Sequence, residues 1–244
     1  MIWGSMKKGG DMRNLLYESE ALRAVTGPFI RPGALTLTEK AMRYCAFAPG
    51  SAIVDVGCGS CGTVEYLRTV YGVRAYGIDP SEVLLAAGRK RAPFLPLVQG
   101  IAEILPFKDH SLEGVFCECV LSLVSDADQV LREFSRVLKP KGFLVITDMY
   151  VRTGVRFSSD ALKERCCIAG ARPRDEIERY LGGQGFSVLL WEDHTWALKE
   201  LAAQLILTYG SLDDFWSSGC SGVVGPHGKV SLGYFLRIAC SHAA

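Results

Sequence analysis

Between residues 51 and 150 the chain alternates short apolar runs with amphipathic segments, and this alternation constrains the fold more than any other feature. Each apolar run has the length of a strand, and the segments between them carry apolar residues at helical spacing. Such alternation predicts a parallel sheet with helices on both faces and right-handed crossovers. We expect strands at 51–57, 73–79, 96–100, 112–120 and 143–150, and helices at 63–72, 81–92 and 126–138.

Beyond residue 150 the alternation is looser but continues. A helix is expected at 173–185, a strand at 186–193, a helix at 195–210 and a seventh strand at 229–240. No internal repeat, low-complexity segment or Pro/Ser-rich linker divides the chain. We therefore expect a single domain, with an N-terminal helical cover at 1–49, a core at 50–244, and helical insertions around 152–183 and 195–220.

The first expected strand runs into a glycine-rich turn, "DVGCGSCGT", at residues 55–63. Glycines let backbone N–H groups approach a bound cofactor closely. The stretch also spells G-x-G-x-x-G, so a dinucleotide enzyme stays open at this point. Cys58 and Cys61 form a C-x-x-C as well, the spacing of redox dithiols and of half a zinc site, for which Cys117 and Cys119 are a conceivable second half.

The charge balance argues against nucleic acid as a partner. Lys and Arg number 27 against 26 Asp and Glu, for a net charge of +1, and no basic stripe is present. No apolar stretch approaches the roughly 18 residues of a membrane span, and the N-terminal segment has no secretory-signal pattern. The nine cysteines are an odd number, so we expect reduced thiols in a cytoplasmic protein rather than a disulfide framework.

Three further motifs follow the glycine-rich turn: "GIDPS" at 77–81, "AEILPF" at 102–107 and "LKPKG" at 138–142. With them the chain closely resembles the class I S-adenosylmethionine-dependent methyltransferases, nearest to the small-molecule branch with quinone-ring and arsenite methyltransferases. The resemblance is strong over residues 50–150 and looser over 160–210. It implies a Rossmann-like, doubly wound α/β fold whose seven-stranded sheet has an antiparallel last strand. It also implies S-adenosylmethionine as cofactor and S-adenosylhomocysteine as product.

The resemblance further implies a cofactor site at the carboxyl ends of the strands. The family's methionine contacts match Asp55, Gly57, Cys58, Gly59 and Cys117, its ribose contact matches Asp79, and its adenine contacts match Pro80, Ile101 and Ala102. Two positions depart from the family pattern. Cys61 stands where the third glycine is usual, and Ile101 replaces an Asp that accepts a hydrogen bond from adenine. The lost acceptor is worth about 1 kcal/mol of binding.

Methyl transfer requires chiefly alignment and desolvation, and a base is needed only if the acceptor must lose a proton. No catalytic dyad is therefore expected. The candidates for a base or a substrate contact are His194, Asp148, Tyr150 and Cys167. The candidates for a metalloid site, matching or standing in for the thiols of arsenite methyltransferases, are Cys61, Cys167 and Cys220. Buried packing cysteines are the alternative interpretation.

The resulting hypothesis is S-adenosylmethionine-dependent methyl transfer to a small-molecule acceptor. We expect a cytoplasmic monomer or homodimer without nucleic-acid or membrane partners, and an N-terminal helix near Tyr17 that closes over the cofactor. Three alternatives stay open: methyl transfer to arsenite or another thiol-bound metalloid, a protein that binds the cofactor without catalysis, and a metalloprotein that uses the cysteines.

Overall fold

The computed structural model describes residues 17–153, 167–168, 170–210 and 231–242. Its strands are β1 (Ala52–Val56), β2 (Arg74–Asp79), β3 (Leu97–Gln99), β4 (Leu112–Glu118), β5 (Leu138–Thr153), β6 (Arg172–Pro173), β7 (Phe186–Asp193) and β8 (Ser231–Ser241). Its helices are α2 (Glu20–Thr26), α3 (Ala34–Cys45), α4 (Gly62–Tyr71), α5 (Glu82–Arg91), α6 (Ala127–Val137), α7 (Arg174–Gly183) and α8 (Thr195–Tyr209).

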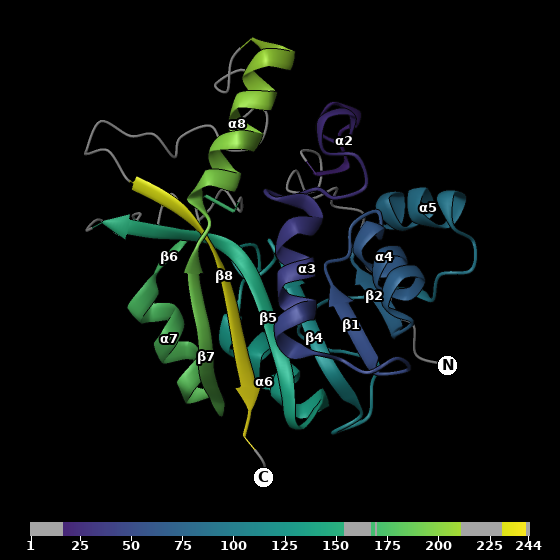
Figure 1. Cartoon of the computed structure of the whole chain (residues 1–244), viewed down its shortest axis with the longest axis vertical. Helices are drawn as coiled ribbons and strands as arrows, with labels where there is room; N and C mark the ends of the chain where they lie inside the picture. Colours follow the sequence, from purple (N-terminus) through teal and green to yellow (C-terminus); the bar gives the residue numbers. More distant parts are fainter. Residues whose placement is uncertain (1–16, 154–166, 169, 211–230, 243–244) are drawn as a thin grey trace, which may run out of the picture.

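The described strands form one sheet in the order β3-β2-β1-β4-β5-β8-β7, with β6 paired to β5 (Figure 1). Neighbouring strands are parallel, except that β8 runs antiparallel to β5 and to β7. This confirms the predicted Rossmann-like α/β fold and its antiparallel last strand. The two-residue β6 is an addition to the seven strands that were predicted.

Apolar layers cover both faces of the sheet, because successive side chains of a strand point to opposite faces. On one face α6 and α7 pack against Val54, Val115 and Leu144. On the other face α3, α4 and α5 pack against Ile53 and Phe116. The helix α3, which was expected as part of an N-terminal cover, therefore belongs to one of the two layers on the sheet. Strand β1 lies inside the sheet, between β2 and β4, and is buried along its whole length.

Local sequence signals set the helix ends beside the carboxyl edge of the sheet. Ser81 caps α5 by accepting a hydrogen bond from the Leu84 N–H at 3.1 Å. Asp126 caps α6 in the same way through the Gln129 N–H at 2.9 Å. Because both helices start at this edge, the loops that precede them face the same space.

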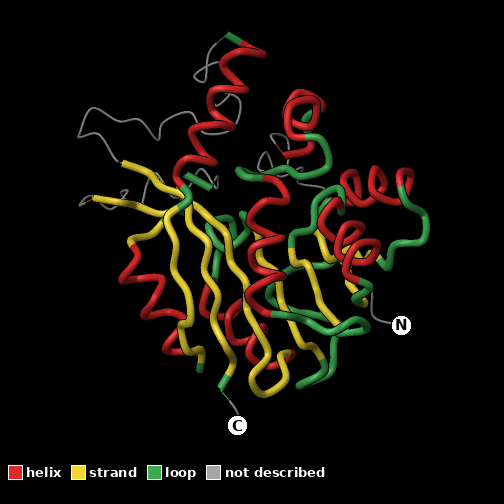
Figure 2. The backbone as a smooth tube through the Cα atoms, in the orientation of Figure 1, coloured by secondary structure: helices red, strands yellow, loops and turns green. Residues whose placement is uncertain are grey.

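The helices α2 and α8 lie beyond the carboxyl edge of the parallel strands, away from the two layers (Figures 1 and 2). They contact each other through Leu22 and Leu205, and the Tyr209 hydroxyl donates a hydrogen bond to the Ala21 carbonyl at 2.6 Å. Of the expected helical insertions, the structure describes α7 and α8; much of the remainder lies outside the described residues. None of the described helices is long and apolar enough to cross a membrane.

Candidate functional site

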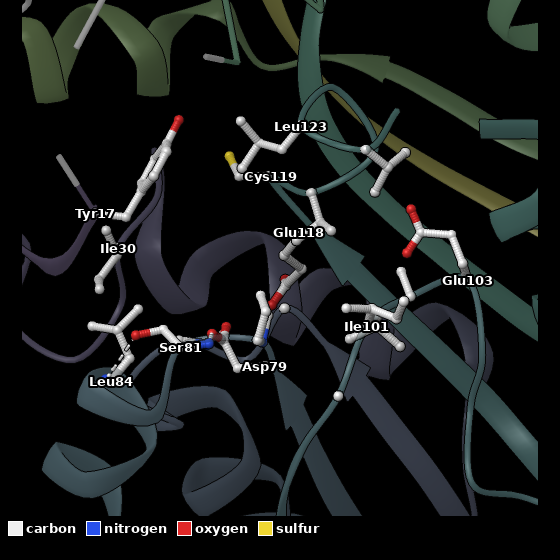
Figure 3. A pocket seen from close by; sticks show the side chains of 18 of the residues that line it. Tyr17, Ile30, Asp79, Ser81, Leu84, Ile101, Glu103, Glu118, Cys119 and Leu123 are labelled. Atoms are coloured by element: carbon white, nitrogen blue, oxygen red, sulfur yellow. Dashed lines mark hydrogen bonds between the residues drawn. The ribbon is translucent and has the colours of Figure 1, made fainter. Parts of the chain in front are cut away.

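A cavity of about 340 Å³ lies at the carboxyl ends of β1, β2 and β4 (Figure 3). Gly57 and Gly59 line it from the turn after β1, Asp79 from the end of β2, and Glu118 from the end of β4. Strand β1 pairs with β2 on one side and with β4 on the other, so the strand order reverses here. Open α/β sheets bind their ligands at such a reversal.

The charged residues that line this cavity are all acidic. They are Glu18, Asp79, Glu103 and Glu118, and no Lys, Arg or His is found among its described lining residues. We therefore refer to it as the acidic cavity. Such a lining favours a ligand that carries positive charge and disfavours one with two phosphate groups.

Asp79 links the two loops that border the acidic cavity. Its Oδ2 accepts a hydrogen bond from the Gly59 N–H at 2.8 Å, and its Oδ1 accepts one from the Ser81 N–H at 2.8 Å. Burial raises the pKa of Asp79, while these two hydrogen bonds oppose that rise. A carboxylate offers about four acceptor positions, so Asp79 retains capacity for donors from a ligand.

The glycine-rich turn needs left-handed backbone at several positions. Gly57 has φ +72°, and a Cβ there would lie 2.2 Å from a methyl carbon of Val120. Cys61 also has a positive φ, +67°, and is fully buried. The third glycine of the family pattern is thus replaced by a residue that keeps the glycine conformation at a steric cost of roughly 1–2 kcal/mol.

The C-x-x-C hypothesis gains no support from the geometry. The sulfurs of Cys58 and Cys61 are 3.4 Å apart in free thiols. The hydrogen bond to Cys61, together with burial, raises the pKa of Cys58 well above its usual range; reactive dithiols need the opposite. Cys117 packs on the other face of the sheet, so no four-thiol zinc site forms. The described part of the chain contains no group of three or more metal-ligating residues.

A buried ion pair lies behind the acidic cavity. The Arg31 guanidinium is 2.9 Å from Glu118 Oε2 and donates a hydrogen bond to the Thr38 hydroxyl at 2.6 Å. That hydroxyl in turn donates to Glu118 Oε1 at 2.9 Å, and the Thr63 hydroxyl donates to Oε2 at 3.3 Å. Burial and the charge of Glu118 raise the pKa of Asp55, and the charge of Arg31 partly opposes this rise.

A second cavity, of about 320 Å³, adjoins the first. Tyr17, Ile30 and Cys119 line both cavities. The remaining lining is mostly hydrocarbon. Leu22, Met149, Leu198, Leu201, Ala202, Leu205 and Leu232 come from α2, α8, β5 and the start of β8, and Pro32 and Ile168 come from segments between elements. We refer to this second space as the apolar cavity.

Asp148 holds the loop that follows β4, which forms a wall of the acidic cavity. Its Oδ2 accepts a hydrogen bond from the Ser122 N–H at 2.8 Å, and its Oδ1 accepts one from the Ser122 hydroxyl at 2.6 Å. Burial raises the pKa of Asp148 to about 6, against these hydrogen bonds. The carboxylate lines neither cavity, so its observed contacts are those of a positioning residue.

Six of the nine residues expected to bind the cofactor line the acidic cavity. They are Gly57, Gly59, Asp79, Pro80, Ile101 and Ala102. Asp55, Cys58 and Cys117 are buried and do not line it. At the end of β4, Glu118 and Cys119 line the cavity in place of Cys117.

The other candidates are distributed over three places. His194 contacts Glu192 Oε2 at 2.8 Å and accepts a hydrogen bond from the Trp196 indole at 3.1 Å. Tyr150 donates to Asp193 Oδ2 at 2.7 Å. Neither of them lines the acidic cavity or the apolar cavity. Cys167 lines the apolar cavity, separately from Cys61, and Cys220 lies outside the described residues.

Sequence reasoning missed Glu118 and Arg31. The run "CEC" at the end of β4 contains a signal for Glu118, because alternation puts it on the face opposite to Cys117. Arg31 stands in an irregular N-terminal segment, 87 positions before Glu118 in the sequence, and no periodic pattern marks it. The expectation that Tyr17 lies near the site agrees with its place in both cavities.

Comparison with known proteins gives similarity to one class. Residues 54–146 match the model of the methyltransferase domain family. It is 36% identical over 119 residues to the uncharacterized methyltransferase YodH of Bacillus subtilis (strain 168), a match that covers 47% of this chain and 50% of YodH. It is 33% identical over 126 residues to the demethylmenaquinone methyltransferase of Bacillus mycoides (strain KBAB4), covering 49% and 53%. The chain thus spans about half the length of the curated relatives that it matches.

Solved structures agree on the fold. The phosphoethanolamine N-methyltransferase 2 of Haemonchus contortus, in complex with S-adenosyl-L-methionine, has a TM-score of 0.75 at 20% identity, covering 98% of this chain and 62% of that one. The 4+2 cyclase SpnF also reaches a TM-score of 0.75, at 22% identity, over 92% of this chain and 93% of that one. One fold therefore serves both a methyltransferase and a cyclase.

Proposed function

We propose that the chain is an S-adenosylmethionine-dependent methyltransferase that acts on a small-molecule acceptor. The observation that carries this proposal is the acidic cavity at the strand-order reversal, with a second cavity directly beside it. Of its four carboxylates, Glu18, Asp79 and Glu103 have no Arg or Lys partner in the described part of the chain, and only Glu118 is paired with an Arg. A cofactor with a sulfonium and an ammonium group suits this lining, whereas a dinucleotide with two phosphates does not. The alternative of a dinucleotide enzyme is disfavoured on this ground.

Each part of the cofactor can be assigned to residues that line the acidic cavity. Asp79 would accept hydrogen bonds from the ribose hydroxyls with the acceptor capacity that Gly59 and Ser81 leave free. Pro80 and Ile101 would border the adenine, and the half-exposed Ile101 offers it an apolar surface instead of a carboxylate. Glu118, rather than Cys117, would lie beside the methionine part of the cofactor. Asp55 and Cys58 would not contact the cofactor but would hold the glycine-rich turn in place.

The bound cofactor would supply an electrophilic methyl group. The chain's own contribution is alignment of two ligands across the shared residues Tyr17, Ile30 and Cys119, together with exclusion of water. Such a reaction needs no protein base when the acceptor atom is already a nucleophile. The net charge of +1 supports a small-molecule partner rather than nucleic acid. We extend the proposal to a cytoplasmic monomer or homodimer.

The strongest rival is a protein of this fold that binds the cofactor without transferring its methyl group. The structural similarity to the SpnF cyclase supports this rival, because SpnF has the same fold and is named for a different reaction. Transfer of a labelled methyl group to a panel of small acceptors separates the two, because binding without turnover would favour the rival. Metalloid methylation has no matching arrangement among the described residues, where Cys61 and Cys167 line different parts of the molecule.

Titration calorimetry with S-adenosylhomocysteine tests the cofactor assignment. Asp79→Ala should raise the dissociation constant by about tenfold or more, the loss expected for a charged hydrogen-bond acceptor. Asp175→Ala removes an equivalent carboxylate from the exposed first turn of α7 and should leave the constant unchanged. Absence of binding by the unmodified protein at millimolar ligand would reject the proposal, and an unchanged constant in Asp79→Ala would reject the ribose assignment.

A further inference from the structure

Among the described residues that line it, the apolar cavity presents few polar groups to a ligand. Two of these residues are charged. Arg31 pairs with Glu118 and donates to Thr38, which leaves its buried Nε as a donor for a neutral ligand, and Lys199 has an exposed side chain. Three polar side chains remain at the end that adjoins the acidic cavity: Tyr17, Cys119 and Cys167. A ligand in this space is therefore surrounded by hydrocarbon along most of its length.

The three polar side chains at the end that adjoins the acidic cavity are uncharged. Burial raises the pKa of the Cys119 thiol and of the Tyr17 phenol well above their usual values, and it raises that of Cys167 to about 11. The Tyr17 oxygen accepts a hydrogen bond from the Cys167 N–H at 3.4 Å, and Cys119 Sγ lies 3.0 Å from the Tyr234 hydroxyl. All three groups are neutral at physiological pH, which matches a neutral ligand better than an ionic one.

The outer wall is formed by α2 and α8, which meet over the cavity. Leu205 of α8 is 1% exposed and Leu22 of α2 is 6% exposed, because they pack on each other. Leu198, Leu201 and Leu205 follow one another at helical spacing along the cavity side of α8. On another side of the same helix Leu207 is 86% exposed. The leucines on the cavity side of α8 thus form part of the cavity wall. Leu207 lies on the same helix outside the cavity and provides a control position for substitutions.

From these observations we infer that the methyl acceptor is a predominantly apolar, uncharged molecule, a hydrocarbon ring or chain with at most one or two neutral polar groups. It lies in the apolar cavity with its acceptor atom beside Tyr17 and Cys119, the side chains that both cavities share. This inference rests on the proposed methyl transfer and assigns its substrate class. Zwitterionic or phosphorylated acceptors are disfavoured, because the described lining offers no carboxylate for a cation, and its buried cation, Arg31, is already paired with Glu118.

The test uses the full chain loaded with S-adenosylhomocysteine and the probe 1-naphthol, a flat apolar molecule with one hydroxyl. Titration calorimetry should detect 1-naphthol but not phosphoethanolamine at about 1 mM ligand. Leu201→Glu should weaken 1-naphthol binding about tenfold or more, because it puts a carboxylate into the hydrocarbon wall. The matched Leu207→Glu, on the same helix but outside the cavity, should leave it unchanged.

Outcomes for this inference and for the proposed function are separable. Failure of S-adenosylhomocysteine to bind would reject the proposed function itself. Normal S-adenosylhomocysteine binding without 1-naphthol binding, or with equal 1-naphthol affinity in Leu201→Glu, would overturn only the apolar acceptor. If Leu201→Glu does not fold, Ala202→Phe fills the same cavity without a charge. It should reduce 1-naphthol affinity to the same degree while S-adenosylhomocysteine affinity stays within about twofold; unchanged 1-naphthol affinity would likewise overturn the inference.

Discussion

The two cavities differ in both chemistry and origin. The acidic cavity is built largely from turns at the ends of β1, β2 and β4, and its charged lining residues are carboxylates. The apolar cavity is built from leucines of α2 and α8 and from residues near the ends of β5 and β8. A parallel sheet brings the ends of its strands together wherever the fold forms, whereas the second cavity depends on helices added outside the sheet. The first space thus follows from the arrangement of the strands, and the second depends on how helices pack outside the sheet.

Arg31 connects the two spaces, since it lines the apolar cavity and pairs with Glu118 of the acidic one. Arg31→Met should have the largest effect, lowering the free energy of unfolding by about 3–5 kcal/mol, because Glu118 would stay buried without its partner. Arg89→Met removes an exposed ion pair with Glu82 and should cost about 0–1 kcal/mol. Denaturant unfolding measures both variants.

A second substitution checks the cause of that loss. Glu118→Gln in the Arg31→Met background should recover part of the stability, because it removes the unpaired charge. Equal losses in Arg31→Met and Arg89→Met would show that the two cavities do not depend on this ion pair.

Asp148 supports the loop that forms a wall of the acidic cavity, and its effect should depend on pH. Its pKa is about 6 in the folded protein, against about 3.9 when unfolded. The folded state binds more protons between these values, so the contribution of Asp148 to stability is full below pH 4 and falls as the pH rises through 6. The stability advantage of the unmodified protein over Asp148→Asn should shrink by about 2 kcal/mol from pH 4 to pH 7.

Asp193 provides a control of opposite sign. Although burial acts against it, hydrogen bonds from Thr195 and Tyr150 lower the pKa of Asp193 to about 2. Its contribution is therefore present above its unfolded pKa of about 3.9 and is lost as the pH falls toward 2. The advantage over Asp193→Asn should grow between pH 2 and pH 4. Parallel pH profiles for the two variants would contradict the assignment of Asp148.

The effect of a substitution in the glycine-rich turn should be confined to one cavity. Gly57→Ala puts a Cβ 2.2 Å from Val120 at φ +72°, so we expect a loss of stability of about 2 kcal/mol. Gly57 and Val120 line only the acidic cavity, so S-adenosylhomocysteine affinity should fall and 1-naphthol affinity should not. Gly182→Ala, in α7 with nothing within 4 Å, should gain up to about 1 kcal/mol. Equal loss of both ligands in Gly57→Ala would mean that the cavities are not separate.

Much of the fold was predictable from the chain itself. The expected strand at 186–193 coincides with β7, the expected helix at 195–210 with α8, and α5 starts directly after its cap, Ser81, within the expected helix at 81–92. These features are local, because hydrophobic periodicity and capping act over a few residues. The position of the acidic cavity could be predicted from the sequence for the same reason. Its glycines and Asp79 lie at the ends of strands, and parallel strands end at one edge of the sheet.

The tertiary structure alone decided which distant residues meet. Cys117 was expected at the cofactor, but β4 turns it into the core and presents Glu118 and Cys119 to the cavities. Arg31 reaches Glu118, and Tyr17 reaches Cys167, across 150 positions of sequence. Such contacts depend on strand register and on how helices pack outside the sheet, for which no local pattern exists. The sequence therefore determined the fold and the glycine-rich turn, and packing decided the apolar cavity beside the acidic one.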